Sequence, residues 1–566
     1  MSSQNGMHGI SGLIRTARGE RRAGLVIKNC TYLNVFTGEW LRGDIAVCGG
    51  TIAGIGEYHG ETEIDASNLI AVPGFIDGHI HLESAMVTPL EFARAVLPHG
   101  TAAVVADPHE IANVLGTAGI DYMLAATSGL PLDVFFMMPS CVPATGLDEN
   151  GAAIGPGDVA KYLKNPRVLG LGEMMDYPGV IGASPAALEK IAAARALSKP
   201  VDGHAPGLSG KALSAYIAAG ITTDHECTAV SEAVEKLRLG QWIMIREGTA
   251  GKNLAALLPL FKPPFSARCL LVTDDKHPGD LVSLGHIDHM VRKAIALGAD
   301  PAAAYTMASH NAALCYHLTG HGALAPGYKA DFLLVSDVQT AAIHSVYKAG
   351  RRVHPPGGGF TLPPPDALGP ALGEFRTGDI GEESFRLGRA RVIGLVPGQL
   401  LTTDEGFADA ACPARDIVKI AVLERHRATG HMGKAYLSGY GLKKGAVALS
   451  VAHDAHNLII AGVNDADMAL AARHVAGLRG GMAVACDGSI LADLALPIAG
   501  LMCALPASLA SKALTRLHNA ARRLGVNPGI DPFMPLSFLS LPVIPALRLT
   551  TLGVTEVRGT GDKTTG

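Results

Sequence analysis

Residues 69–84 read LIAVPGFIDGHIHLES, an apolar strand-like run that ends in the motif His79-Ile80-His81. Successive side chains of a strand point to opposite faces, so residues two apart point the same way. We therefore expect the imidazoles of His79 and His81 to lie on one face, close enough to share a metal ion. Neutral imidazole is a ligand for Zn, Mn, Fe or Ni. Because an HxH pair also occurs as two polar residues in a loop, this interpretation needs further ligands elsewhere in the chain.

The sequence on the carboxyl side of this motif alternates apolar strand-like runs with Ala/Leu-rich helical segments such as residues 187–198 and 210–220. Eight alternations over about 250 residues are typical of a (β/α)8 barrel and favour it over a doubly wound open sheet. The eight predicted strands are residues 69–76, 101–106, 134–138, 168–172, 200–203, 221–223, 242–245 and 269–273.

Further candidate ligands stand where later strands end. Glu173 follows the fourth predicted strand, His204 the fifth, His225 the sixth and Asp274 the eighth. The carboxyl ends of barrel strands surround one mouth, and barrel active sites are built there. Together with the HxH pair, this mouth would hold four histidines and two carboxylates. Such a set predicts a two-metal site in which a carboxylate bridges ions about 3.5–4 Å apart.

The flanking sequence predicts three further units. Residues 25–70 and 320–360 are both short β segments, and we expect them to pair into one composite β-sandwich around a barrel of residues 71–319. A Pro/Gly-rich linker at residues 361–375 leads to a second α/β domain at residues 376–566. Residues 1–24 form an N-terminal extension.

Composition excludes several other classes of function. The chain has 566 residues, 47 basic and 51 acidic side chains and a net charge of −4, so it lacks the basic surface of a nucleic-acid-binding protein. Its longest apolar run, residues 494–510, contains two prolines and is shorter than the roughly 20 residues of a membrane span. The N-terminus has no apolar signal segment, and nine cysteines without a CxxC motif indicate reduced thiols. We therefore expect a cytoplasmic protein that binds neither nucleic acid nor membrane.

Several longer motifs resemble a known family. PGFIDGHIHLE at residues 73–83 and GALAPGYKADFLLV at residues 322–335 are similar to the amidohydrolase superfamily. Finer motifs resemble its bacterial-type adenine deaminases, and so does the C-terminal stretch at residues 430–468. The finer motifs are ESAMVTPLEFA, GTAAVVADPHEIANVLG, GLGEMMDYPGV, DGHAPGLSG and TDDKHPGDL.

The resemblance implies a glutamate-bridged pair of divalent ions. Many amidohydrolases bridge their metals with a carboxylated lysine on the fourth strand, whereas this sequence has Glu173 there. By the resemblance, Glu173 with His79, His81 and Asp274 would hold one ion, and Glu173 with His204 and His225 the other. The family implies Mn2+, with Fe2+ or Zn2+ as alternatives.

The implied reaction is hydrolysis of adenine to hypoxanthine and ammonia in purine salvage. Two ions that share a water lower its pKa from near 15.7 toward 7 and give a hydroxide that attacks C6. Asp274 is the expected base, which passes the proton on to the amino group, although the neighbouring Asp275 is an alternative ligand. Glu110, in the segment Asp107-Pro108-His109-Glu110, is the candidate for protonating N1 if burial raises its pKa, or for accepting a purine N–H.

The roles of some residues stay open. Asp107 and His109 are further candidates for substrate contact, but the same segment is also consistent with a loop cap. His225 and Glu226 are candidates for touching the substrate. The motif HDAHN at residues 453–457 fits a polar turn between two strands, a segment that reaches over the barrel mouth, or a site for a further metal ion.

Two other functions remain alternatives. One is a cyclic-amide hydrolase of the dihydroorotase or hydantoinase kind, and the other is a non-catalytic scaffold with this fold. The low charge and high apolar content permit a homo-oligomer, for which a dimer is the simplest expectation.

Overall fold

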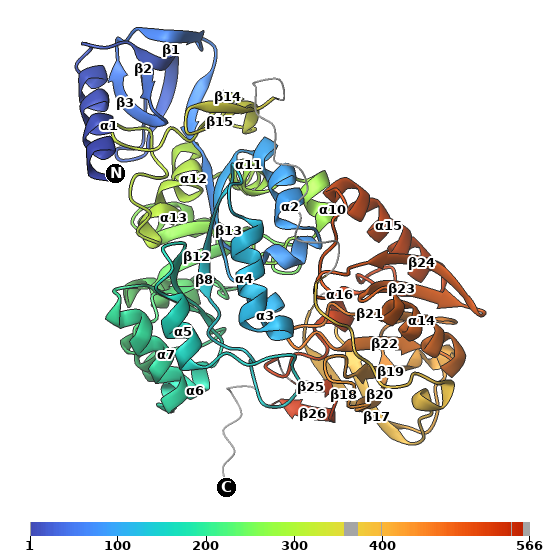
Figure 1. Ribbon diagram of the computed structural model, residues 1–566. Coiled ribbons are helices and arrows are strands. Elements are labelled where there is room, and N and C mark those ends of the chain that lie inside the picture. The colour runs from blue at the N-terminus through green and yellow to red at the C-terminus, as the bar shows by residue number, and fades with distance from the viewer. Residues whose placement is uncertain (1, 356–371, 398, 545, 558–566) are drawn as a thin grey trace.

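The computed structural model describes residues 2–355, 372–397, 399–544 and 546–557. A barrel forms the centre of the molecule, and a small sheet and a C-terminal unit lie against different sides of it (Figure 1). Across these described ranges, no helix combines the length and the hydropathy needed to cross a bilayer.

The eight strands predicted for the middle of the chain form a closed parallel barrel. From β6 to β10, each strand is hydrogen-bonded to the next strand along the chain, and the same holds from β11 to β13. Two backbone hydrogen bonds close the ring, from Thr222 N–H to the Val201 carbonyl and from Asp274 N–H to the His79 carbonyl, both at 2.9 Å. The (β/α)8 prediction is confirmed. The strands are β6 (Phe75–Ile80), β7 (Thr101–Ala106), β8 (Asp133–Met138), β9 (Val168–Met174), β10 (Val201–Gly203), β11 (Thr223–Asp224), β12 (Trp242–Arg246) and β13 (Cys269–Val272).

The first predicted strand, residues 69–76, is wrong in its bounds because it joins two strands of different sheets. β5 (Ile70–Pro73) belongs to the small sheet, and β6 starts the barrel at Phe75. The break falls at Gly74, where a Cβ would lie 2.7 Å from the Cβ of Ala102, so the barrel approaches too closely for a side chain.

Helices surround the barrel, and several begin with clear capping signals. Thr88 accepts a hydrogen bond from Glu91 N–H ahead of α2, and Asp300 does the same for Ala303 ahead of α12. Proline occupies the first turn of both helices, where its missing N–H costs nothing. The helices of this region are α2 (Pro89–Val96), α3 (His109–Leu115), α4 (Thr117–Ala126), α5 (Pro156–Tyr162), α6 (Tyr177–Ile181), α7 (Pro185–Ala196), α8 (Gly210–Ala218), α9 (Val230–Arg238), α10 (Pro278–Ser283), α11 (Ile287–Ala296), α12 (Pro301–Met307) and α13 (His310–Cys315).

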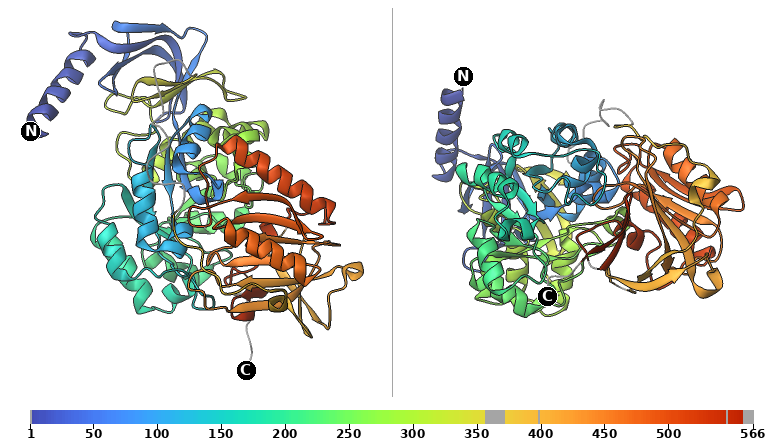
Figure 2. Two further views of the ribbon diagram at one scale, coloured as in Figure 1. Left: turned by 45° about the vertical axis from the view of Figure 1, so that its right-hand side comes forward. Right: turned by 90° about the horizontal axis from the view of Figure 1, so that it is seen from below.

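The segments before and after the barrel meet in one sheet, with the strand order β16-β15-β14-β5-β1-β2-β3 and β4 paired to β1. The predicted pairing of the two segments is thus present, while the exact domain boundaries remain a prediction. In the N-terminal extension, α1 (Ser2–Ala17) stands at the edge of this sheet (Figure 2). The strands are β1 (Ala23–Asn34), β2 (Glu39–Cys48), β3 (Thr51–Gly56), β4 (Gly60–Asp65), β14 (Phe332–Asp337), β15 (Ala342–Lys348) and β16 (Arg351–His354).

The C-terminal unit is an eight-stranded mixed sheet with the order β18-β17-β20-β19-β22-β21-β23-β24. Only part of the predicted linker at residues 361–375 can be placed, because residues 361–371 lie outside the described residues. The elements are β17 (Ala390–Leu395), β18 (Thr402–Ala408), β19 (Ile417–Leu423), β20 (Met432–Ser438), β21 (Ala446–Leu449), β22 (Leu458–Gly462), α14 (Asp465–Gly477), β23 (Gly481–Cys486), β24 (Ser489–Ala495), α15 (Ala507–Arg523), α16 (Met534–Ser537), β25 (Ala546–Thr550) and β26 (Gly553–Val557).

Alternate residues of β19 show how this sheet joins the barrel. Ala421 and Leu423 pack in a cluster with α14 on the outer face. Val418 and Ile420 point the other way and belong to the same buried cluster as Ile111 of the barrel helix α3. The C-terminal sheet and the barrel therefore share one continuous apolar core.

Candidate metal centre and active site

All six predicted ligands lie at the mouth formed by the carboxyl ends of the barrel strands. His79 lies in β6 and His81 follows that strand, while Glu173 lies near the end of β9. The other three directly follow, or nearly follow, β10, β11 and β13; they are His204, His225 and Asp274. Their side chains approach one another closely enough to form several groups whose ligand atoms lie within 4.8 Å of each other. The structure thus brings together residues spread over almost 200 positions of the chain.

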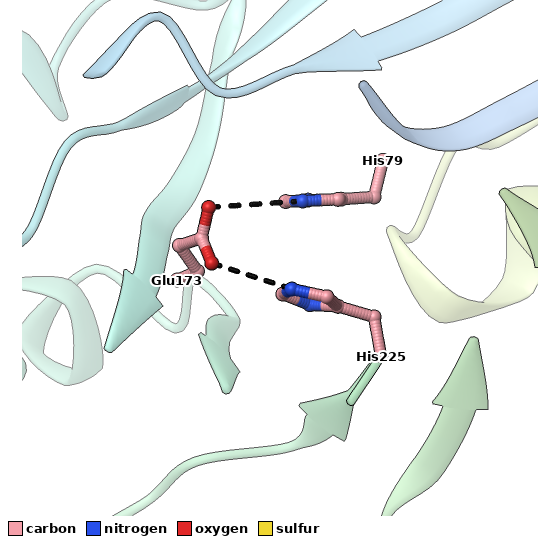
Figure 3. A group of neighbouring side chains, drawn as sticks. All are labelled: His79, Glu173 and His225. Carbon is pink, nitrogen blue, oxygen red and sulfur yellow. Dashed lines mark ion pairs between the residues drawn. The ribbon is translucent and has the colours of Figure 1, made fainter. Parts of the chain in front are cut away.

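The Glu173 carboxylate lies at the centre of these groups, with its two oxygens facing different histidines (Figure 3). Oε1 is 3.3 Å from His81 Nε2 and 3.8 Å from His79 Nε2. Oε2 is 2.7 Å from His204 Nδ1 and 3.3 Å from His225 Nε2. One carboxylate therefore presents each of its oxygens to a different pair of imidazoles, which is the arrangement a bridging ligand requires.

The two neighbouring aspartates point to different partners. Asp274 Oδ1 lies 3.1 Å from His81 Nε2, and its Oδ2 accepts a hydrogen bond of 2.7 Å from Arg246. Asp274 adopts a left-handed backbone with φ of 58°, which is uncommon for a residue other than glycine. Asp275 instead accepts a hydrogen bond of 2.5 Å from Ser84 Oγ. Of the two, Asp274 has its carboxylate among the histidines.

The chemistry of this donor set fits divalent cations. His79 is 1% exposed, and its Nε2 has no hydrogen-bond partner among the described residues. Burial and the charge of His225 lower the pKa of His79 well below its usual value, so this imidazole stays neutral, as a metal ligand must be. Burial raises the pKa of Glu173, but the surrounding histidines lower it well below the usual range. Burial lowers the pKa of the other three ligand histidines, His81, His204 and His225, but the neighbouring carboxylates raise it above the usual value. The centre therefore offers ionised carboxylate oxygens and imidazoles that would release protons when divalent ions bind.

The segment after β7 forms the adjoining wall of the site. His109 begins α3, and its Nδ1 lies 3.4 Å from Glu173 Oε1 while its Nε2 lies 3.5 Å from Glu110 Oε1. Asp107 accepts a hydrogen bond of 2.9 Å from the backbone N–H of Glu173. The Asp107 side chain therefore supports the central glutamate and does not cap the helix that follows, whose cap position is Pro108.

Glu110 is held by two histidines of the C-terminal unit. His453 Nδ1 lies 2.6 Å from Glu110 Oε1, and His456 Nε2 hydrogen-bonds to Oε2. Burial raises the pKa of Glu110, but its interactions with His453, His456 and His109 lower it well below its usual value. The condition for a neutral, proton-donating Glu110 is therefore not met by these surroundings. The loop that carries HDAHN thus reaches the residues of the barrel mouth, while its binding of a further metal ion stays a prediction.

Glu226, a sequence candidate for substrate contact, lies in the mouth beside two residues that are missing from the sequence predictions, Arg246 and Glu83. Glu226 lies 3.4 Å from His225 Nε2 and 3.8 Å from His204 Nδ1, while Arg246 hydrogen-bonds to both Glu226 and Asp274. Arg246 ends β12, so the strand-end rule that found the other residues also applies to it. Glu83 is buried beside the site, and burial raises its pKa to about 7. No spacing signal distinguishes Glu83 from other polar residues of its segment.

A closed (β/α)8 barrel with imidazoles and carboxylates around its mouth defines the class of metal-dependent hydrolases called amidohydrolases. The model of the amidohydrolase family matches residues 70–353. A second model, that of the adenine deaminase C-terminal domain, matches residues 399–560. The two matches cover the barrel with the strands that return to the small sheet, and most of the C-terminal unit.

Full-length relatives identify the branch of that family. The chain is 48% identical over 563 residues to adenine deaminase 2 of Carboxydothermus hydrogenoformans, covering 97% of this chain and 98% of the relative. It is 45% identical to the adenine deaminase of Desulfatibacillum aliphaticivorans, over 96% of this chain and 97% of the relative. It is 46% identical to that of Dehalococcoides mccartyi strain CBDB1, over 97% and 98%. The chain belongs to the adenine deaminase family.

Proposed function

We propose that this protein hydrolyses adenine to hypoxanthine and ammonia and so serves purine salvage. The observation that carries the proposal is the Glu173 carboxylate between two pairs of imidazoles, in a chain related over its whole length to adenine deaminases. A hydrolase of carbon–nitrogen bonds needs a nucleophile at neutral pH and a group that moves protons, and this mouth contains candidates for both.

The proposed cofactor is a pair of divalent ions. His79, His81, Asp274 and Glu173 would hold one ion, and Glu173, His204 and His225 the other. When bound, such ions lower the pKa of a shared water toward 7 and so supply hydroxide. Mn2+ is the proposed metal, with Fe2+ or Zn2+ as alternatives, since imidazole and carboxylate ligands accept all three.

The protein's own groups would then move the protons. Asp274 takes the proton of the attacking water and passes it to the amino group of C6, which leaves as ammonia. Arg246 supports this role, since its hydrogen bond to Asp274 Oδ2 fixes the orientation of the carboxylate. Glu110, kept ionised by its histidine neighbours, accepts a hydrogen bond from a purine N–H. The adenine ring is proposed to lie against His109, His225 and Glu226. Asp107 holds Glu173 in place through the hydrogen bond that it accepts from the Glu173 backbone N–H.

The competing functions have less support. Cyclic-amide hydrolases usually carry a lysine where this chain has Glu173, and the C-terminal domain is that of adenine deaminases. A scaffold without activity would not need six convergent ligand groups. We further propose a cytoplasmic homodimer, in line with the net charge of −4 and nine cysteines that are all free.

The test is to load the protein with Mn2+, Fe2+ or Zn2+ and follow the ultraviolet spectrum of adenine, with product hypoxanthine confirmed by chromatography. Chelation should abolish the conversion, and readdition of the metal should restore it. Dihydroorotate and hydantoin serve as comparison substrates. Absence of hypoxanthine with all three metals, or faster turnover of a cyclic amide, would refute the proposal.

A further inference from the structure

The loop between β21 and β22 carries two histidines of the C-terminal unit onto a carboxylate of the barrel. His453 and His456 each contact one oxygen of Glu110, which lies in α3 of the barrel. All three side chains are almost fully buried, with exposures of 6%, 1% and 2%. This contact joins residues 346 positions apart in the chain.

The direction of the His456 hydrogen bond is fixed by its other ring nitrogen. His456 Nδ1 accepts a hydrogen bond of 3.1 Å from the backbone N–H of Ala452. In a neutral imidazole one nitrogen accepts and the other donates. Nε2 therefore carries the ring proton and donates a hydrogen bond to Glu110 Oε2.

The loop is held rigidly by the rest of the C-terminal unit. The backbone N–H of His453 donates to the Ser537 carbonyl (2.9 Å), and the His453 ring stacks on Phe538 with 4.3 Å between centroids. Arg425 donates to the carbonyls of His456 and Ala499. The two donors that meet Glu110 are thus fixed with respect to the C-terminal sheet.

A second contact docks the same loop on the barrel. Asn457 Nδ2 donates to the carbonyl of Glu149 (2.8 Å), in the segment between β8 and α5. Val451 and Ala452, which directly precede His453, belong to the apolar core that the C-terminal sheet shares with the barrel. The loop therefore forms part of the buried wall of the barrel mouth.

We infer that His453 and His456 are positioning residues of the active site: the C-terminal unit holds Glu110, one oxygen per histidine, in the orientation that receives the purine. The inference rests on the proposed deamination of adenine. A buried carboxylate without partners is costly and free to rotate, whereas one donor on each oxygen fixes its plane and leaves further lone pairs for a substrate N–H. The barrel by itself would then supply the metal ligands, but it would not hold the Glu110 carboxylate in the orientation that binds the substrate.

The experiment compares variants of the full-length, metal-loaded protein. His453→Ala and His456→Ala should each lower kcat for adenine about 10- to 100-fold, as is typical for removing an outer partner of an active-site group, with unchanged metal content. His474→Ala is the matched control, because His474 lies on α14 and pairs with Asp493 away from the mouth. It should retain wild-type kcat.

Conservative variants separate positioning from folding. Asn at position 453 keeps an N–H near the place of Nδ1, and Gln at position 456 keeps one near Nε2. His453→Asn and His456→Gln should therefore be much more active than the exchanged pair, His453→Gln and His456→Asn, in which the donor is displaced by one bond. This comparison remains decisive if the alanine variants fail to fold.

A double-mutant cycle provides the readout that a purely structural role would not change. In a Glu110→Gln background, His453→Ala should lower kcat by less than about twofold, because residues that act through one group are not additive. Additive losses, or alanine variants with wild-type kcat, would overturn the inference. If Glu110→Gln is fully active on adenine, the inference fails while the proposed function stands. If the wild-type protein does not convert adenine, both fail together.

Discussion

The two halves of this active site are built in different ways. The six proposed metal ligands all belong to the barrel and stand at strand ends, where the closure of the sheet alone brings them to one mouth. The Glu110 contact instead joins the barrel to a separate sheet and depends on how the two dock. The comparison separates what a fold guarantees from what an interface must add, and the two halves should respond differently to substitution.

The largest effect is expected at the centre of the barrel half. Glu173→Gln removes one charge from the carboxylate that, among the described residues, faces both imidazole pairs, so bound metal should fall below two ions per chain. Activity should fall at least about 10⁴-fold, because without the ions water keeps a pKa near 15.7. Metal analysis and adenine turnover measure both effects.

Glu91→Gln is the matched control for that substitution. Glu91 is also a buried glutamate, but it pairs with Arg94 on α2 and should keep both ions. Two ions per chain in the Glu173→Gln protein would contradict the bridging role.

The next effect distinguishes Asp274 from Asp275. Asp274→Asn should lower kcat about 10³-fold, in the range for loss of a general base, since its carboxylate lies among the histidines. Asp275→Asn should change kcat by no more than about threefold, as expected for a residue outside the reacting groups. Steady-state kinetics of the two variants decide which aspartate transfers the proton. Equal losses of kcat would show that catalysis needs both Asp274 and Asp275.

The interface half should lose activity without losing metal. Glu110→Gln should lower kcat about 100-fold, which is the lower end for an acid–base or hydrogen-bonding group, while two ions remain bound. Glu173→Gln, by contrast, should lose both metal and activity. A Glu110→Gln protein that has lost metal would place Glu110 in the metal centre and merge the two halves.

How much could be predicted from the sequence follows the same division. The barrel and the six clustered residues were predictable, because parallel strands have a regular alternation and a polar residue at a strand end must lie at the mouth. Arg246 obeys the same rule and was recognisable in principle. The error at residues 69–76 arose because Pro73 and Gly74 separate two strands without interrupting the apolar run.

The interface half could not be predicted with the same certainty. Nothing in HDAHN distinguishes a polar turn from a segment that contacts Glu110, because the contact depends on how the C-terminal sheet docks on the barrel and not on local spacing. The charge state of Glu110 also depends on this contact with the C-terminal unit. Burial alone would raise the pKa of this carboxyl, whereas His453 and His456 of the other unit, together with His109 of the barrel, lower it.

The smallest effect expected is a pH dependence of stability that belongs to the interface half. Burial lowers the pKa of His453, but Glu110, Asp275 and Asp454 raise it to about 9, above the unfolded value near 6.5. The charged pair therefore stabilises the folded protein fully below about pH 6.5, and this contribution is lost as the pH rises through about 9. It is on the order of 1–3 kcal/mol, so the melting temperature should fall by a few degrees between pH 7 and pH 10.

Two variants isolate that contribution from other groups that titrate in the same range. His453→Asn cannot gain or lose a proton, so its melting temperature should fall less steeply from pH 7 to pH 10 than that of the wild type. His456→Gln should follow the wild type, because burial lowers the pKa of His456 to about 4 and the ring is neutral throughout this range. Parallel curves for wild type and His453→Asn would mean that His453 is uncharged at pH 7. The C-terminal unit would then hold Glu110 by neutral hydrogen bonds alone, and the two halves of the site would differ in origin but not in electrostatics.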